Sequence, residues 1–404
     1  MEILYHKLYK YVKLRLYLGV IMKKKALIII LFVLFLLCFF VLFLNLKNRS
    51  KNNPELINYK TLEYGKIAYI SDYIKDVKKD KKIEYTNLGD LKIEYITSRK
   101  KEILNINVVD TSAPVVMLNE RLTIVQGSTD NLVEKIMCAD NYDKHPKCEI
   151  KGEYDLNIVG TYPLVFVAED SSGNITTIDF ELNVIEKTNS SKTSSETNIN
   201  DIINNHKNEQ TKIGIDVSKW QGEIDWNKVK ESGIEFAMIR MGTQGGFGEE
   251  NYVDKYFVTN IENALKENIE VGIYFYSYAI TKAEAINQAK YVLEQVKGYD
   301  ITLPIVFDWE SWSSFNNLDL NLYEITQIQE AFLNEIKNAG YKTARYGSKN
   351  YLTKVWQESE HLTWLAHYTK NTNYDGEYFM WQLCNNGKVP GINGYVDIDV
   401  MYEY

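Results

Sequence analysis

Apolar and polar residues follow two different periods along this chain of 404 residues. Between about residues 53 and 186, short alternating apolar runs are broken by Gly, Asn and Asp, which indicates an all-β region. From residue 212 onward, apolar runs alternate with amphipathic stretches, which predicts strand–helix–strand units. We therefore expect two kinds of domain, in agreement with a length too great for one ordinary domain.

The β-rich region contains a repeated pattern and divides into two modules, residues 53–110 and 111–186. Each copy ends in two alternating apolar stretches: Gly89–Tyr95 and Leu104–Val109 in the first, Gly160–Val167 and Phe180–Ile185 in the second. The second copy begins with the Asp-x-x-Ala-Pro motif at Asp110 and resembles the bacterial immunoglobulin-like repeats of surface proteins. The first copy is shorter and more degenerate. The resemblance implies two immunoglobulin-like stalk modules without chemistry of their own.

Two features of the second module bear on ligands and crosslinks. The segment Asp170–Asn174 has the composition of a turn, and we interpret it as a plain turn because no spaced series of carboxylates accompanies it; calcium binding is the less favoured alternative. Cys138 and Cys148 flank a polar loop, which is compatible with a disulfide or with two free thiols. The histidines of the chain have no metal-ligand spacing, so we predict no metal and no cofactor.

The N-terminal segment is apolar and is preceded by basic residues. Ala26 to Leu44 carries no charge, and at about 1.5 Å per residue it would span roughly 28 Å, enough for a bilayer core. We predict a basic cytoplasmic N-terminus (1–25), one transmembrane helix (26–46), and everything beyond it outside the cell, facing the wall. A cleaved signal peptide is the alternative. The polar segment 187–211 is typical of a flexible linker.

Residues 212–404 predict a barrel. Eight strands are expected, at Ile213–Val217, Phe236–Met241, Val271–Tyr278, Leu303–Asp308, Thr343–Gly347, Leu362–Tyr368, Tyr378–Leu383 and Tyr395–Val400. Three amphipathic helices are expected, at Val253–Lys266, Lys282–Lys297 and Asn321–Asn338. Alternating strands and helices favour a parallel sheet, so the predicted fold class is a TIM-like α/β barrel with incomplete helices in its last third.

Four carboxylates stand at the ends of these predicted strands: Asp216, Asp308, Glu310 and Asp397. Strand side chains alternate, so Asp308 and Glu310 share one face. The first and last strands of a closed barrel are neighbours, which should bring Asp216 close to Asp397. Any one of these acids could be a solvated strand end. Four that converge at the mouth of a barrel are the arrangement that acid-assisted cleavage of a sugar bond requires.

Composition narrows the class of substrate. A net charge of −8 argues against a nucleic-acid binder, because neutralising phosphates requires a basic surface. The chain is rich in aromatic residues, with 30 Tyr and 7 Trp, which can be core or can stack on sugars. The candidates for substrate binding are Tyr274, Tyr276, Trp381, Gln382, Trp220 and Trp364.

The ordered motifs of the last domain resemble one known family. They are Gly214-Ile215-Asp216-Val217-Ser218, Ile224-Asp225-Trp226, Met238-Ile239-Arg240, Gly272-Ile273-Tyr274-Phe275, Pro304–Glu310, Trp364-Leu365-Ala366, Met380-Trp381-Gln382 and Gly394–Asp399. In this order they look like glycoside hydrolase family 25, the lysozyme-type muramidases. The resemblance covers a little under half of the chain.

The resemblance implies cleavage of the β-1,4 bond between N-acetylmuramic acid and N-acetylglucosamine in peptidoglycan. Glu310 matches the general acid, Asp308 its partner carboxylate, and Asp216 and Asp397 the flanking pair. The mechanism stays open between direct attack by Asp308, attack by the substrate's own N-acetyl group, and an inverting course with a water between the two carboxyls. One departure is Arg345, which stands where the family usually has an apolar residue; pointing into the groove, it would alter subsite preference.

Two other functions compete with this hypothesis. A non-catalytic, peptidoglycan-binding surface scaffold would suit the tandem stalk modules, and a chitinase-like glycosidase would use the same acids. The biological purpose of wall cleavage and the oligomeric state cannot be inferred from the residues.

Overall fold

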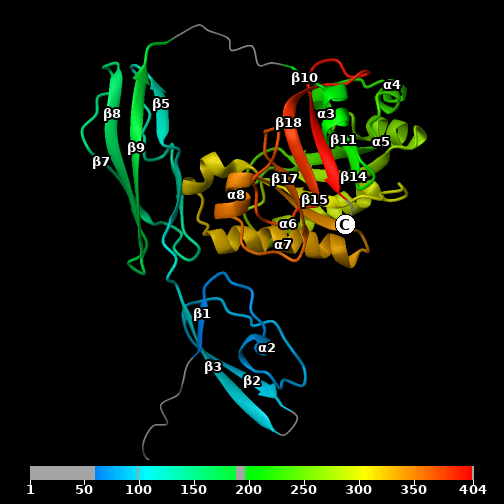
Figure 1. The fold of residues 1–404 in the computed structure, drawn as a ribbon. Helices are drawn as coiled ribbons and strands as arrows, with labels where there is room; N and C mark the ends of the chain where they lie inside the picture. Colours follow the sequence, from blue (N-terminus) through cyan, green and yellow to red (C-terminus); the bar gives the residue numbers. More distant parts are fainter. Residues whose placement is uncertain (1–59, 98–99, 188–195, 403–404) are drawn as a thin grey trace, which may run out of the picture. The chain divides into compact units, whose positions relative to one another are not determined.

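The computed structural model describes residues 60–97, 100–187 and 196–402 (Figure 1). The predicted cytoplasmic segment 1–25 and the predicted transmembrane segment 26–46 lie outside these residues. Within the part of the chain that is described, no helix combines the length and the apolar character needed to cross a membrane. The transmembrane helix of the predicted fold class is therefore not found.

Residues 60–109 contain a small three-stranded sheet. Its strands are β1 (Lys60–Glu63), β2 (Gly89–Ile96) and β3 (Lys101–Val109), in the order β1-β3-β2, and the short helix α2 (Ile70–Tyr73) accompanies them. Alternate residues of β3, such as Leu104 and Ile106, enter a small apolar core, because side chains on a strand alternate between its two faces. Whether this module is immunoglobulin-like stays a prediction.

Residues 115–185 form a second β region. Its strands are β4 (Val115–Met117), β5 (Arg121–Val125), β6 (Met137–Ala139), β7 (Lys147–Lys151), β8 (Gly160–Glu169) and β9 (Ile175–Ile185). They make a two-stranded sheet, β4-β6, and a four-stranded sheet, β5-β9-β8-β7, around a core that includes Phe166 and Leu182. A disulfide between Cys138 and Cys148 joins β6 to β7. The immunoglobulin-like assignment of this region also stays a prediction.

The last domain is a closed barrel of eight strands. They are β11 (Thr211–Val217), β12 (Phe236–Gln244), β14 (Glu270–Tyr276), β15 (Ile305–Asp308), β16 (Thr343–Ser348), β17 (Leu362–Ala366), β18 (Met380–Lys388) and β19 (Val396–Tyr402). The sheet runs β18-β17-β16-β15-β14-β12-β11-β19, and pairing of β18 with β19 closes it. The short strand β13 (Asn251–Val253) pairs with β12 outside the ring.

The predicted TIM-like α/β barrel is wrong. Strand β19 runs antiparallel to both of its neighbours, β11 and β18. Only residues 389–395 connect β18 to β19, and a parallel pair would need a crossover of about a dozen residues or more. The connection is therefore a return turn without a helix, and the barrel is a β-rich variant with mixed strand directions.

Helices cover the barrel over the first two thirds of the domain (Figure 1). They are α4 (Trp226–Glu231), α5 (Phe257–Lys266), α6 (Lys282–Val296), α7 (Leu322–Asn338) and α8 (Lys349–Lys354). Capping boxes define where the two long ones begin: Thr281 with Glu284 starts α6, and Asn321 with Glu324 starts α7. Each pair satisfies backbone N–H groups that the first turn leaves without partners.

The predicted flexible linker, 187–211, is wrong in its second half. Strand β10 (Thr197–Asn198) pairs with β18, and helix α3 (Ile199–His206) follows it directly. Ile199 and Ile202 are buried in the main core of the barrel, and Asn198 caps the helix. The helix was not predicted because the segment is polar on average. One narrow apolar stripe is enough to attach a helix to the barrel.

Two apolar layers hold the barrel together. An outer layer between strands and helices includes Phe275, Phe307 and Trp381. An inner layer inside the barrel includes Met238, Val306 and Trp364. Because the seven ring strands other than β19 run in one direction, their carboxyl ends meet at one mouth, and the inner layer lies beneath it.

Candidate active site

The four predicted carboxylates line one cavity of about 220 Å³ at the mouth of the barrel. Asp216 ends β11, Asp308 ends β15, and Glu310 stands two residues beyond it, before the short helix η2 (Ser311–Asn317). Asp397 is the cross-strand partner of Asp216. Barrel closure thus brings together acids that lie far apart in the sequence.

Strand alternation decides how the acids of β15 are presented. Asp308 is buried, Glu310 is exposed at the mouth, and Trp309 between them is buried in the outer layer. The rings of Trp309 and Trp312 pack against each other with centroids 4.7 Å apart. This edge-to-face pair holds the outer side of the turn, and the two carboxyl groups line the cavity.

Asp308 and Glu310 form a coupled pair. Burial raises the pKa of Asp308, the neighbouring Glu310 carboxyl raises it further, and the Arg240 guanidinium opposes both effects. Displacement of water by the surrounding protein also raises the pKa of Glu310, although that side chain reaches solvent. Two like charges this close disfavour ionisation of both carboxyls at once.

Arg240 was not among the predicted site residues, yet it lines the cavity. Its Nε and Nη2 donate to Oδ2 of Asp254 at 2.8 and 2.6 Å, and both side chains are buried. The same Asp254 oxygen accepts the backbone N–H of Lys219 at 3.0 Å. Asp254 therefore orients a cation beside Asp308 and holds the rim helix η1 (Lys219–Gln221).

A glutamine organises the other wall of the site. Nε2 of Gln382 donates to Oδ2 of Asp216 at 2.8 Å. Its Oε1 accepts from the hydroxyls of Tyr346 at 3.0 Å and Tyr368 at 2.9 Å. The predictions named Gln382 and missed both tyrosines, whose signal was only their place at the ends of β16 and β17.

A fifth carboxylate, Asp399, lies under the site. It is fully buried, and the indole Nε1–H of Trp364 donates to its Oδ1 at 2.8 Å. Burial raises its pKa, against the hydrogen bond from Trp364, and the neighbouring Asp397 adds to the rise. The signal was available: Asp397 and Asp399 are two residues apart on one strand and share a face.

The predicted aromatic residues fall into two groups. Tyr274, Tyr276 and Trp364 line the cavity, and Trp220 stands at its rim with 76% of its surface exposed. Trp381 does not: it is buried in the outer layer, and its indole N–H donates to the carbonyl of His367 at 2.8 Å. Trp381 and Gln382 are adjacent in β18, so only one of them can face the cavity.

Arg345 does not point into the groove. Its Nη1 donates to the carbonyl of Gln357 at 2.6 Å, and its Nε donates to the hydroxyl of Thr363 at 3.3 Å. It lies on the outer face of β16, since its neighbour Tyr346 takes the inner face. A role for Arg345 in subsite preference is therefore not supported.

A larger hollow, of about 880 Å³, opens at the opposite end of the barrel strands. Two of its acidic side chains are paired with lysines, Glu235 with Lys207 and Glu270 with Lys212. Exposed ion pairs of this kind contribute little energy and are common on protein surfaces. The smaller cavity at the carboxyl ends is the one equipped for acid–base chemistry.

Asp397→Asn should stabilise the protein in a pH-dependent way. Burial, with the nearby Glu310, raises the pKa of Asp397 to about 6 from its ordinary 3.8. Between these values the folded state holds a proton that the unfolded chain releases. The free energy of unfolding of the wild type therefore falls as the pH rises towards 6. We expect a gain of about 1–2 kcal/mol in the free energy of unfolding at pH 7.5, and little at pH 4.

Urea unfolding at both pH values measures this difference. Asp375→Asn is the matched control, because Asp375 is exposed in the same domain and its replacement should change neither value. An equal gain at pH 4 and at pH 7.5 would contradict the assignment.

The sequence was compared with known proteins. The family model of glycosyl hydrolases family 25 matches residues 215–392. The uncharacterized protein YegX of Escherichia coli K12 is 32% identical over 197 residues, covering 46% of this chain and 68% of YegX. The chain belongs to glycosyl hydrolases family 25. It is therefore a glycoside hydrolase, and its catalytic domain is the barrel.

Two further proteins match about the same part of this chain. Lysozyme M1 of Streptomyces globisporus is 29% identical over 208 residues, covering 46% of this chain and 65% of that protein. A solved family 25 glycosyl hydrolase from Bacillus anthracis is 26% identical and covers 53% of this chain and 96% of that chain, with a TM-score of 0.44. These matches span about half of the present chain.

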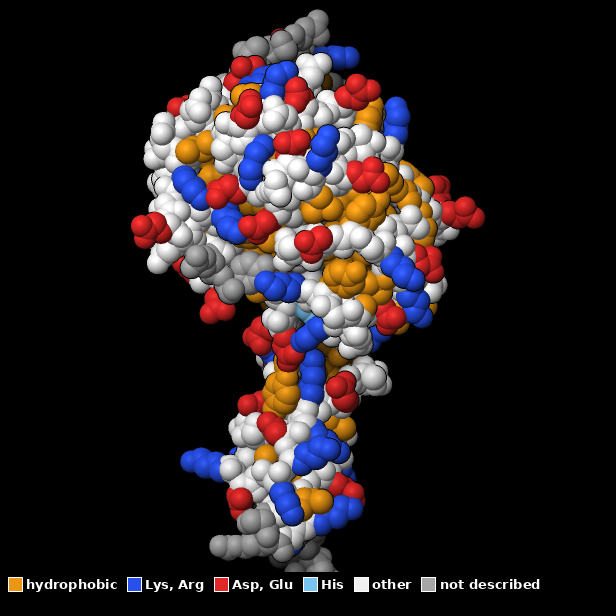
Figure 2. Space-filling view, turned by 90° about the vertical axis from the view of Figure 1, so that its right-hand side faces the viewer, with side chains coloured by type: hydrophobic (Ala, Val, Ile, Leu, Met, Phe, Trp, Pro, Cys, Tyr) orange, Lys and Arg blue, Asp and Glu red, His pale blue; other side chains and the backbone are white. Residues whose placement is uncertain are grey.

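The surface of this family 25 hydrolase carries mixed charge. On the face seen in Figure 2, acidic and basic side chains are interspersed, and the basic ones do not gather into a stripe. A continuous basic stripe is the footprint of nucleic-acid binding. The visible face therefore agrees with the net charge of −8 in pointing away from such a partner.

Proposed function

We propose that this enzyme is a muramidase, which hydrolyses the β-1,4 bond between N-acetylmuramic acid and N-acetylglucosamine in peptidoglycan. The observation that carries the proposal is the single cavity shared by Asp308, Glu310, Asp216 and Asp397. The name of lysozyme M1, a relative that is 29% identical, supports the choice of substrate. The predicted location of the catalytic domain outside the cell stays a prediction.

In this proposal Glu310 is the general acid. It reaches solvent at the mouth of the cavity, where the oxygen of a leaving sugar can approach it. Its pKa is raised by the protein around it, so it can keep a proton near neutral pH and transfer it to the glycosidic oxygen. Asp308 is buried beneath it and is the partner that this mechanism requires in its ionised form, against the effect of burial, which raises its pKa.

Asp308 would stabilise the positive charge that grows on the anomeric carbon. Burial and the Glu310 carboxyl raise the pKa of Asp308, and the guanidinium of Arg240 opposes both effects. A carboxyl separation of about 5–5.5 Å goes with a retaining course and one of about 6.5–9.5 Å with an inverting course. The course stays open between direct attack of Asp308, attack of the substrate's N-acetyl oxygen and attack of a water.

Asp216, Asp397 and Gln382 would bind the reacting sugar. Gln382 is fixed by three hydrogen bonds, one given to Asp216 and two taken from Tyr346 and Tyr368. A preorganised polar wall of this kind loses little entropy on binding and keeps the sugar aligned with the acids.

Incubation of the full chain with purified peptidoglycan tests the function. A mild detergent is included because of the apolar stretch 26–44. Release of glycan fragments whose reducing end, identified by borohydride reduction and mass spectrometry, is N-acetylmuramic acid would support the proposal. Reducing ends of N-acetylglucosamine alone, or faster cleavage of chitin oligomers, would overturn it. Binding to peptidoglycan without product would favour the non-catalytic scaffold.

Trp220→Ala should weaken substrate binding without affecting the chemical step. The ring is 76% exposed at the rim of the cavity, so its natural use is as a flat surface on which a sugar can stack. We expect KM to rise about 3- to 10-fold, with kcat and thermal stability nearly unchanged. Initial rates over a range of concentrations of a soluble peptidoglycan oligomer measure both constants. Tyr154→Ala, at an exposed tyrosine outside the barrel, should change neither.

A further inference from the structure

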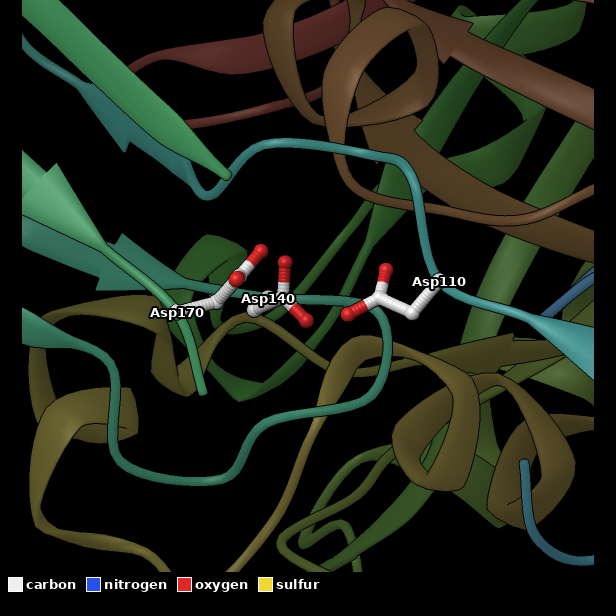
Figure 3. Close-up of side chains that lie close together, drawn as sticks. All are labelled: Asp110, Asp140 and Asp170. Carbon is white, nitrogen blue, oxygen red and sulfur yellow. The ribbon is translucent and has the colours of Figure 1, made fainter. Parts of the chain in front are cut away.

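Three aspartates outside the catalytic domain converge on one point. Asp110 follows β3, Asp140 follows β6, and Asp170 begins the turn between β8 and β9. One carboxylate oxygen from each lies within 4.8 Å of the others. Figure 3 shows the three side chains directed toward one another. All three are at least 92% buried, with exposed fractions of 8%, 1% and 5%.

Each carboxylate is oriented by hydrogen bonds from backbone N–H groups or from a serine hydroxyl. Oδ2 of Asp140 accepts the backbone N–H groups of residues 142 and 143 at 2.7 and 2.9 Å. Oδ1 of Asp170 accepts those of residues 172 and 174 at 2.9 and 2.8 Å. Oδ2 of Asp110 accepts the hydroxyl of Ser172 at 2.7 Å. Such bonds hold acidic side chains in place for a ligand.

Some carboxylate oxygen atoms of the cluster have no hydrogen-bond partner. Oδ1 of Asp140 is buried and accepts no hydrogen bond. Oδ1 of Asp110 is likewise buried and accepts no hydrogen bond, in a side chain that is 92% buried. In the described part of the chain, no lysine, arginine or histidine forms an ion pair with any of the three aspartates.

Buried carboxylates without a cation are costly. Burial raises the pKa of Asp140 to about 6, and the charges of Asp110 and Asp170 contribute to the rise. The cluster therefore presents oriented carboxylate oxygen atoms without hydrogen-bond partners, and a cation would bind them.

We propose that Asp110, Asp140 and Asp170 bind one calcium ion. Calcium takes six to eight oxygen ligands at about 2.3–2.6 Å, so oxygen atoms up to about 5 Å apart can share it. Magnesium requires a tighter octahedron, and zinc prefers nitrogen and sulfur. Backbone carbonyls or water would complete the shell.

The ion would tie the end of β3 to two loops of the following β region. The turn Asp170–Asn174, interpreted from sequence as a plain turn, contributes one ligand of this site. Sequence reading missed the site because its other acids come from distant segments and not from one spaced loop. The inference does not depend on the proposed muramidase activity.

Calorimetric titration of the full chain, kept in mild detergent and stripped with a chelator, tests the proposal. Calcium chloride should bind to one site per chain with a dissociation constant of roughly 10⁻⁵–10⁻³ M. Asp140→Asn should weaken binding by more than about 10-fold, and Asp110→Asn should do the same. Asp179→Asn, at an exposed position on β9, should bind like the wild type.

Thermal unfolding separates loss of binding from loss of folding. In chelator, Asp140→Asn should unfold at the wild-type temperature or above, because it removes one of three like charges. Calcium should raise the unfolding temperature of the wild type and not that of the variant. Absence of calcium binding to the wild type, unchanged binding by Asp140→Asn, or tighter binding of magnesium than of calcium would each overturn the assignment.

Discussion

Glu310→Gln should lower the rate of peptidoglycan hydrolysis by about 10²- to 10⁴-fold, the usual contribution of a positioned general acid. The amide has nearly the shape of the acid and cannot supply a proton to the leaving oxygen. KM should change little, because Glu310 stands at the mouth of the cavity and the polar wall formed by Gln382 is intact. Removing a charge from this coupled pair should not destabilise the fold.

Initial rates of reducing-end release measure this effect, and a second substrate identifies its cause. An aryl glycoside whose phenol leaves without protonation should restore much of the lost rate, because it does not need the acid. Glu223→Gln, at an exposed glutamate of the same domain, is the matched control and should keep full activity. Full activity in Glu310→Gln would remove Glu310 from the mechanism.

Asp308→Asn should be about as damaging, with a loss of about 10²- to 10³-fold that reflects missing stabilisation of the transition state. Asp308 is buried and faces the guanidinium of Arg240, so no other carboxylate can take its place beneath the sugar. An activated leaving group should not restore this loss, since the positive charge still develops on the anomeric carbon. The two variants therefore differ in a way that a purely structural role would not produce.

Rates with the aryl glycoside and with peptidoglycan, at matched pH, distinguish these cases, and far-UV circular dichroism checks that the variant is folded. Recovery of Asp308→Asn on the activated substrate would contradict the assigned role. A glycan lacking the N-acetyl group on the reacting sugar adds one distinction. It should remain a substrate under direct attack by Asp308 and should fail if the acetamido oxygen is the nucleophile.

Local periodicity carried much of the prediction of the site. Two acids separated by one residue share a face of a strand, and this placed Asp308 and Glu310 together and Trp309 behind them. The proximity of Asp216 to Asp397 followed from the closure of a barrel, which the number of strands suggested. These inferences need only the spacing of residues within a strand and the order of strands along the chain.

Periodicity was insufficient wherever the choice of face mattered. Trp381 and Gln382 were both expected in the groove, although neighbours on a strand must point in opposite directions. The same holds for Arg345 and Tyr346, of which only Tyr346 lines the cavity. A pattern of alternation indicates which residues go together, but packing of the helices on the outer layer decides which set faces outward.

Contacts between distant segments were also invisible beforehand. Arg240 is held by Asp254, and Asp399 by Trp364 across the barrel. The cluster of Asp110, Asp140 and Asp170 combines three separate segments. Each contact joins polar groups buried by the fold, and their pairing has no periodic signal.

The amino-acid sequence by itself determined that a β-rich region precedes an eight-stranded barrel, the order of the barrel strands, the family, and the acids at the strand ends, because these depend on short-range spacing and residue type. Only the tertiary structure decided the antiparallel direction of β19, the inner face of each strand, the docking of α3, and the partners of the buried charges. These depend on how the chain returns on itself and on which groups lose water together, and neither is written in any local stretch of residues.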